Sequence, residues 1–288
     1  MRRKIIDKLY DGIIALFLSI VGIIMIVPLL SVLATSLSKS IAVEAGKVFL
    51  LPVDITLASW RYILLRADLW RSFGVTFLAT VIGTTLALII TAFLAYPLSK
   101  KYFALAKILG VFVIITMIFK APIIPYFLTI KNLGLFDNFF VLVLPHTVTA
   151  YNLVIMRSFF SQLPADLEES AKIDGAGYFK IFWRILLPMS KPVMATLGLF
   201  YSVMIWNQFL HPILFIQSQA LFPLQLRLRQ YITAGEDLVN SSITELLDYN
   251  DVTLKSATII FAVVPILMVY PYIQKYFVKG AMLGSVKG

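Results

Sequence analysis

Residues 73–98 read FGVTFLATVIGTTLALIITAFLAYPL, an apolar run that contains no charged side chain. About 20 apolar residues in a helix cover the hydrocarbon core of a bilayer. Further long apolar runs lie on either side, at about 12–36, 107–129, 139–160, 191–216 and 256–278. The sequence therefore predicts an all-α membrane protein with six transmembrane helices, in which residues 1–288 form a single transmembrane domain.

The composition agrees with a membrane protein and leaves little room for catalysis. The 288 residues are 60% hydrophobic and 14% charged, whereas soluble domains are roughly 45–50% apolar and 25% charged. Because the chain has no cysteine, disulfides, thiolate metal sites and a cysteine nucleophile are excluded. The formal charge of +10 does not predict nucleic-acid binding, because no basic run is interleaved with aromatic residues.

The basic residues between the runs predict the orientation of the chain. An even number of spans places both termini on the same side. Lys100, Lys101 and Lys107 lie in or beside one short connection, whereas the short connection on the other side carries only Lys131. Short loops rich in Lys and Arg face the cytoplasm. We therefore expect a multi-pass protein of the bacterial inner membrane with both termini in the cytoplasm and the first run retained.

One cytoplasmic connection, residues 161–190, carries the signals of a folded structure. Pro164 suits the first turn of a helix, and Gly175 can end that helix in a left-handed conformation. Asp166, Glu168 and Glu169 complement the positive end of the helix dipole. A second short helix is expected over 178–186, ended by Pro188. The sequence thus predicts a helix-turn-helix bracket on the inner membrane surface.

The spacing within this connection resembles the signature loop of the inner-membrane subunits of binding-protein-dependent ABC importers. That pattern is Glu-Ala-Ala, three residues, Gly, nine residues, Ile, one residue and Leu-Pro. The chain matches it at Glu169, Ser170, Ala171, Gly175, Ile185, Leu187 and Pro188. Ser170 in place of the first Ala is the one departure, and serine is small enough to keep close packing.

The resemblance implies that this segment is a cytoplasmic coupling helix between spans four and five. In the family it docks into a groove of the ATP-hydrolysing subunit and transmits the closure of that subunit to the pore. The residues implied in coupling are Glu168, Glu169, Ser170, Ala171, Asp174, Gly175, Ile185, Leu187 and Pro188. The alternative reading of the residues alone is an amphipathic interfacial helix without a partner.

The same resemblance implies the partners. These are a homologous permease subunit, usually in a heterodimer, two ATP-binding subunits and an extracellular or periplasmic solute-binding protein. The Trp206-Asn207 pair and the ending KGAMLGSVKG, 279–288, resemble the carbohydrate-uptake branch that includes the maltose transporter. The stretches at 123–138 and 270–280 resemble a subgroup that imports complex or modified oligosaccharides.

The chain lacks the motifs of nucleotide hydrolysis and of other catalysis. It contains no GxxxxGK[ST] loop to cradle phosphates and no GxSxG elbow. His146 and His211 lie on different runs without a Cys or carboxylate at ligand spacing, so no metal site is expected. We expect no catalytic residue and no cofactor in this chain, since the resemblance assigns ATP and Mg to the partner ATPase subunit.

Polar side chains inside the predicted spans are candidates for a substrate pathway, because such groups are costly against lipid. Asn207 and His211, four residues apart, share a helix face. The candidates are Lys120, Tyr126, His146, Tyr151, Asn152, Tyr201, Trp206, Asn207, Gln208 and His211. The alternatives are snorkelling of Lys120 to the outer headgroups and hydrogen bonding between helices by the amide side chains.

Lys120, with Arg227 and Arg229 in the last outer connection, raises the hypothesis that the cargo is an acidic oligosaccharide. The alternative function is an ion-coupled secondary transporter or a channel. Carriers of that kind usually use ionisable groups within the membrane. The six predicted spans contain neither Asp nor Glu, which favours the ATP-driven importer.

Overall fold

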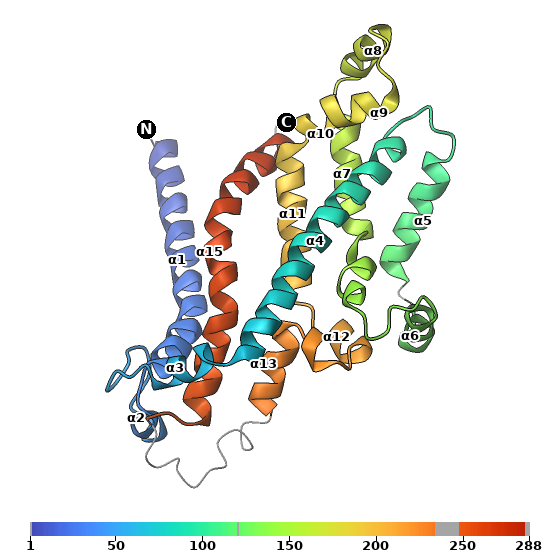
Figure 1. The fold of residues 1–288 in the computed structure, drawn as a ribbon. Coiled ribbons are helices and arrows are strands. Elements are labelled where there is room, and N and C mark those ends of the chain that lie inside the picture. The colour runs from blue at the N-terminus through green and yellow to red at the C-terminus, as the bar shows by residue number, and fades with distance from the viewer. Residues whose placement is uncertain (1, 120, 234–247, 286–288) are drawn as a thin grey trace. The chain divides into compact units, whose positions relative to one another are not determined.

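The computed structural model describes residues 2–119, 121–233 and 248–285, which are almost entirely helical (Figure 1). Within them the β-structure is an isolated bridge between Ser38 and Ile55. The all-α prediction is confirmed. The elements are α1 (Arg2–Ser36), α2 (Ser40–Glu44), α3 (Ala58–Leu64), α4 (Ala67–Leu98), α5 (Ala106–Ile118), α6 (Ile123–Asn132), η1 (Phe139–Leu142), η2 (Leu144–His146), α7 (Ala150–Gln162), α8 (Ala165–Ile173), α9 (Tyr178–Ile181), η3 (Phe182–Leu186), α10 (Leu187–Met189), α11 (Lys191–Trp206), α12 (Leu210–Phe215), η4 (Gln219–Leu221), α13 (Leu224–Thr233) and α15 (Asp251–Ser285).

The internal contacts divide the chain into two units. Unit 1 comprises Met1–Trp70 and Leu228–Val264, and unit 2 comprises Arg71–Arg227 and Pro265–Gly288. The division falls within α4, α13 and α15. All of the predicted coupling residues lie in unit 2, as do the described pathway candidates.

Three described helices are long and apolar enough to span a bilayer: Tyr10–Ser36, Ala67–Leu98 and Asp251–Met268. They correspond to the first, second and sixth predicted runs. The third run is broken, because α5 ends at Ile118 and α6 leaves it at an angle of 118°. Pro122, which caps α6, has no N–H to bond the Ile118 carbonyl and so cannot continue α5.

The fourth and fifth predicted runs are also discontinuous. The 139–160 run consists of two short 3₁₀ turns bent by 46° from α7, and Pro145 lies in the second turn. The 191–216 run is divided between α11 and α12. There Pro212 removes the N–H that would bond the Gln208 carbonyl. Each of these three predicted runs is therefore interrupted in the described structure.

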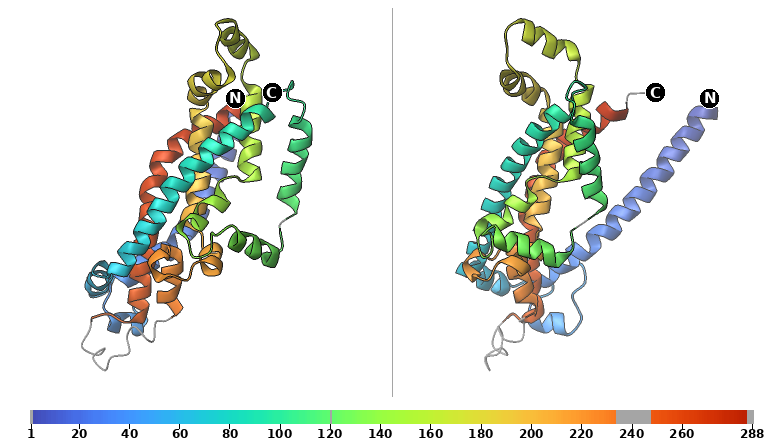
Figure 2. Two further views of the ribbon diagram at one scale, coloured as in Figure 1. Left: turned by 45° about the vertical axis from the view of Figure 1, so that its right-hand side comes forward. Right: turned by 90° about the vertical axis from the view of Figure 1, so that its right-hand side faces the viewer.

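Unit 2 is held together by two buried apolar clusters, one toward each end of α4. The first joins α4, α7 and α11 to the connection that follows α7, with Met156, Phe182 and Leu197 fully or almost fully buried. The second joins α4 to α6, η1, α11 and α12, with Val141 and Phe215 at its centre. Figures 1 and 2 show α4, α7 and α11 side by side. This packing fixes the base from which the 161–190 connection projects.

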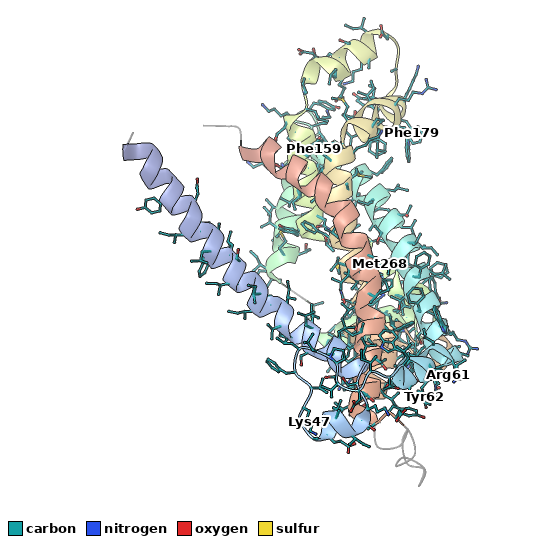
Figure 3. The ribbon with its side chains drawn as sticks, turned by 90° about the vertical axis from the view of Figure 1, so that its left-hand side faces the viewer. Lys47, Arg61, Tyr62, Phe159, Phe179 and Met268 are labelled. Carbon is teal, nitrogen blue, oxygen red and sulfur yellow. The ribbon has the colours of Figure 1, made fainter. Side chains whose placement is uncertain are left out.

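Unit 1 is built around the first helix and the start of α15. Ser59 on α3 donates to Thr253 Oγ1 at 2.9 Å, and this bond links α3 to the start of α15. Lys47, Arg61 and Tyr62 lie at the end of the unit formed by α2 and α3 (Figure 3). Over the apolar span of α1, from Tyr10 to Ser36, almost no side chain is buried. Most of the apolar surface of that helix is therefore not covered within unit 1.

Candidate functional site

The first half of the 161–190 connection folds as predicted. Pro164 caps α8, and the acidic residues of its first turn favour the helix dipole. Gly175 has φ +76°, a left-handed conformation that glycine adopts readily. The N–H of Gly175 donates to the Lys172 carbonyl at 3.0 Å, and the N–H of Ala176 to the Ala171 carbonyl at 2.9 Å. These bonds satisfy the last carbonyls of α8 and fix where it ends.

The second half departs from the prediction of one helix over 178–186 ended by Pro188. The chain forms α9, then a π-helical turn over η3, and then α10. Pro188 lies in the first turn of α10 and does not stop the helix. A proline is tolerated at a helix start, and the wider π turn before it accommodates the change of hydrogen bonding.

The predicted coupling residues occupy two faces of the connection. Glu169, Ser170, Asp174, Gly175 and Pro188 are exposed, and Ile185 and Leu187 are half-buried.

Glu168 and Ala171 are buried, with exposed fractions of 6% and 8%. Ile173, at the end of α8, is 87% exposed. Helix α8 therefore turns both charged and apolar side chains outward, while the buried side chains of Glu168 and Ala171 attach it to the rest of unit 2.

Glu168 forms the centre of a polar network, named here the Glu168 cluster: Glu168, Tyr96, Lys100, Tyr102 and Lys172. Its carboxylate accepts from Tyr102 Oη at 2.9 Å, from Tyr96 Oη at 3.2 Å and from the Lys100 ammonium. Lys172 lies 2.9 Å from Glu168 Oε1, one helical turn further along α8. The cluster thus joins α8 to the C-terminal end of α4 and to the turn that follows it.

The charges of the Glu168 cluster are mutually stabilised. Burial raises the pKa of the Glu168 carboxyl, but the hydrogen bonds from Lys100, Lys172 and Tyr102 outweigh it and lower the pKa to about 2. The hydrogen bond to Glu168 raises the pKa of Lys172. Burial and the adjacent carboxylate raise the pKa of Tyr102. Glu168 is therefore an anion, and Tyr102 a neutral donor, near pH 7.

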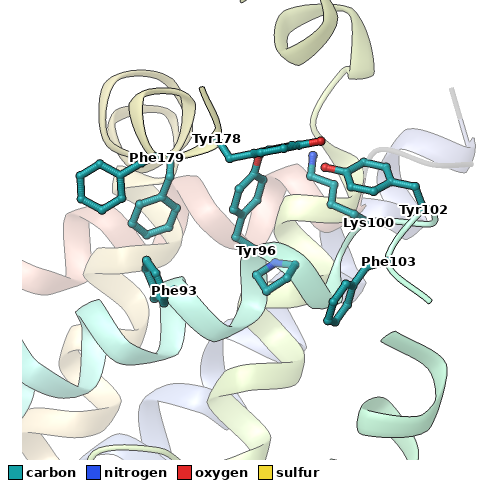
Figure 4. Close-up of a pocket in the computed structure, with 9 residues that line it drawn as sticks. Phe93, Tyr96, Lys100, Tyr102, Phe103, Tyr178 and Phe179 are labelled. Atoms are coloured by element: carbon teal, nitrogen blue, oxygen red, sulfur yellow. The ribbon is translucent and has the colours of Figure 1, made fainter. Parts of the chain in front are cut away.

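A pocket of about 400 Å³ lies beside the cluster, between α4 and α9 (Figure 4). In Figure 4 the side chains of Lys100 and Tyr102 point toward each other at its rim. Its lining is Phe93, Tyr96, Pro97, Lys100, Tyr102, Phe103, Tyr178, Phe179 and Phe182. Aromatic side chains dominate this surface, so the space between α9 and the end of α4 is apolar and only partly filled.

The structure brings together four of the predicted pathway residues. Tyr126 Oη and His211 Nε2 are 3.2 Å apart, and the rings of His146 and His211 lie 4.5 Å apart between centroids. Gln208, in the break after α11, donates to the Leu142 carbonyl at 3.2 Å and lies beside His146. Among the described residues, the buried His211 Nδ1 has no hydrogen-bond partner. We name Tyr126, His146, Gln208 and His211 the histidine cluster.

The other pathway candidates lie elsewhere. Tyr201 is fully buried, 2.7 Å from Thr91 Oγ1, and is part of the helix packing. Trp206 packs edge-on against Phe73, and Asn152 is buried near the start of α7.

Tyr151 and Asn207 are exposed, and the Asn207 side chain accepts from Gln225 at 3.3 Å. Lys120 lies outside the described residues. Among the described residues, the histidine cluster is thus the largest group of pathway candidates that contact one another.

Residues 87–282 match the family model described as the inner membrane component of binding-protein-dependent transport systems. The match includes the whole 161–190 connection. The chain belongs to this family. It is therefore a membrane permease component of such a transport system.

Relatives of the permease are similar over almost their whole length. Protein LplC of Bacillus subtilis is 42% identical over 98% of this chain and 96% of its own. A polygalacturonan/rhamnogalacturonan transport system permease protein, YtcP, of the same organism is 38% identical over 98% and 99%. A crystal structure of a bacterial ABC transporter involved in the import of the acidic polysaccharide alginate matches with a TM-score of 0.87. Its chain is 32% identical, over 94% of the permease and 97% of itself.

Sequence reasoning did not find three functional candidates of the permease, Lys100, Tyr102 and Lys172. Lys100 had served only to predict the orientation of the chain, and Tyr102 had no part in any prediction. Lys172, four residues after Glu168, was a detectable signal, because oppositely charged residues at this spacing pair on a helix. Nothing in the sequence indicated that Lys100 approaches Glu168.

Arg227, which the hypothesis of an acidic cargo includes, makes contacts within unit 2 of the permease. Its side chain is buried and donates to the Gln219 carbonyl at 2.8 Å and to Ser72 Oγ at 3.4 Å. The guanidinium also lies 5.0 Å from the centre of the Phe222 ring. Arg227 therefore stabilises the connection between α12 and α13.

Proposed function

We propose that the permease forms one half of the pore of an ATP-driven importer that passes an oligosaccharide from a binding protein to the cytoplasm. The observation that carries the proposal is the two-faced α8, anchored by Glu168 and Ala171 and projecting Glu169 and Ile173. An exposed apolar side chain beside exposed carboxylates suits a partner surface. Family membership and the 0.87 TM-score to an importer chain support it.

Alternating access is the proposed mechanism. ATP closes the nucleotide-binding subunits, the coupling helices move together, and the pore opens toward the binding protein; release of ADP reverses the movement. Hydrolysis belongs to separate subunits, because this chain has no phosphate-binding loop. Glu169, Ser170, Asp174 and Gly175 meet the ATPase, whereas Glu168 and Ala171 hold α8 in place.

The proposed assembly is a heterodimer of two homologous permeases with two ATP-binding subunits and a solute-binding protein. Each permease crosses the membrane six times, with both termini in the cytoplasm. The crossings that follow α4 are built from the bent pair α5 and α6, the 139–162 segment, and α11 with α12. Broken helices of this kind are tolerated where they line a cavity or pack against protein.

The histidine cluster is the proposed contact with the sugar inside this subunit. Its imidazole, amide and phenol groups offer both donors and acceptors, and Tyr126 and His211 add ring faces. Sugars are bound through such directed hydrogen bonds combined with aromatic surface. The buried Nδ1 of His211 has no partner to lose when a hydroxyl group approaches.

The coupling role is tested by co-purification of the ATPase subunit with a tagged permease. Ile173→Lys places a charge on the exposed end of α8, where a cation favours the helix dipole and does not weaken the helix. We expect recovery of the ATPase to fall, because the charge must be desolvated in a groove. The matched control is Leu65→Lys, since Leu65 is 76% exposed at the C-cap of α3. Equal recovery with both variants would contradict the assignment.

We further propose that the cargo is acidic, a class of uronic-acid oligosaccharide. The polygalacturonan/rhamnogalacturonan permease and the solved alginate importer, together with Lys120 in the third run, support this. Lys120→Met is expected to raise the KM for a uronic-acid trisaccharide roughly tenfold, equivalent to ~1.4 kcal/mol. Lys131→Met, on α6, is the control. If the KM for a neutral trisaccharide rises equally, Lys120 does not recognise the charge of the cargo.

A further inference from the structure

The attachment of α8 to the rest of unit 2 rests on very few side chains. Of its nine residues, Glu168 and Ala171 are buried. Ala171 contributes a methyl group to the first apolar cluster and has no polar atom with which to set an orientation. Glu168 is thus the residue that determines which way α8 faces.

Three of the four partners of Glu168 lie far from it in the sequence. Both carboxylate oxygens are used: Oε1 accepts from Tyr96, Tyr102 and Lys172, and Oε2 pairs with Lys100. Tyr96, Lys100 and Tyr102 belong to the end of α4 and the turn after it. Lys100 also lies 5.0 Å from the centre of the Tyr96 ring. A buried charge with several partners resists separation from them, because each would lose its compensation.

The covalent route from α8 toward α11 passes through two glycines. Residues 174–177 contain Gly175 and Gly177, neither of which has a neighbouring atom within 4 Å of where a Cβ would lie. Glycine gives such a link unusual backbone freedom. The pocket of about 400 Å³ between α9 and α4 also leaves space there for small displacements. The glycine link alone therefore restricts the orientation of α8 less than the Glu168 cluster does.

We propose that Glu168 is a positioning residue that binds α8 to the end of α4, so that α8 and α4 move together during transport. This inference rests on the proposed function, in which the ATPase moves α8. The two adjacent glutamates then have different roles: Glu169 faces the ATPase, and Glu168 transmits the resulting movement to α4.

The first test uses the complete complex in proteoliposomes: both permeases, the ATPase subunits and the binding protein. ATP hydrolysis and oligosaccharide uptake are measured in the same preparation. Glu168→Gln is expected to lower the ratio of sugar taken up to ATP hydrolysed by ~2- to 30-fold, the range found for residues on a coupling route. Glu169→Gln, the matched control, is expected to lower both activities together. An unchanged ratio in Glu168→Gln, whatever the loss of total activity, overturns the proposal.

A second test does not depend on the stability of the first variant. Because the chain has no cysteine, Lys100→Cys combined with Glu168→Cys provides a single pair that a short bis-maleimide can join. If α8 and α4 move together, cross-linking restores the ratio of uptake to hydrolysis that the unlinked pair has lost. If cross-linking stops uptake or leaves the ratio unchanged, the proposal is wrong. Failure of the proposed function is distinguishable, because then no ATPase subunit is recovered with the unmodified permease.

Discussion

Gly175 and Gly177 are two residues apart, but their backbone conformations differ and tolerate different side chains. Gly175 has φ +76°, whereas Gly177 has φ −69° at the N-cap of α9. A side chain in the left-handed region costs about 1–2 kcal/mol. A serine is well accepted at a helix N-cap. Neither glycine has a neighbour that an added Cβ would strike.

Gly175→Ser is therefore expected to destabilise the permease by about 1–2 kcal/mol, and Gly177→Ser to leave its stability unchanged or slightly higher. The measurement is thermal unfolding of the detergent-purified permease, followed by intrinsic fluorescence. Because the surrounding space is equally open at both positions, a similar loss in the two variants would show that conformation at Gly175 is not what ends α8.

Residue patterns predicted the end of α8 but not the roles within it. The left-handed Gly175 and the acidic first turn could be predicted from the sequence, because helix capping depends on residues that are neighbours in the chain. The sequence grouped Glu168 with Glu169, although Glu168 is buried and Glu169 is exposed. Separating them requires knowledge of where Lys100 and Tyr102 lie, and those residues approach only through the packing of α4 against α7. The histidine cluster depends likewise on the break between α11 and α12.

At the scale of elements, the length of the apolar runs predicted where the apolar helices lie better than it predicted where those helices are interrupted. The 73–98 run lies within α4, because no helix-breaking residue interrupts it before Pro97. In the third run, Pro122 leaves the carbonyl of Ile118 without an i+4 donor, and α5 ends at that residue. With 13 residues, α5 is about 20 Å long, shorter than a hydrocarbon core of about 30 Å. Whether a proline kinks a helix or ends it depends on its neighbours, which composition does not reveal.

At the scale of the whole molecule, the proposed topology can be tested with single cysteines, since the chain contains none of its own. The chosen positions are exposed: Leu51, Lys101, Lys131 and Asp174. On intact cells, an impermeant maleimide is expected to label cysteines at 51 and 131 alone. Those at 101 and 174 should react only after the membrane is permeabilised. Labelling of 101 and 131 from the same side would mean that α5 and α6 do not cross the membrane.

The Glu168 cluster also has a consequence for the order in which the permease is made. Lys100 and Glu168 are 68 positions apart, so the carboxylate is synthesised well after its main cationic partner. Chains are made from the N-terminus at about 5–20 residues per second, so Lys100 waits several seconds or more for Glu168. The segments α5, α6 and α7 are all synthesised in that interval. The ion pair therefore closes only after these segments have been made.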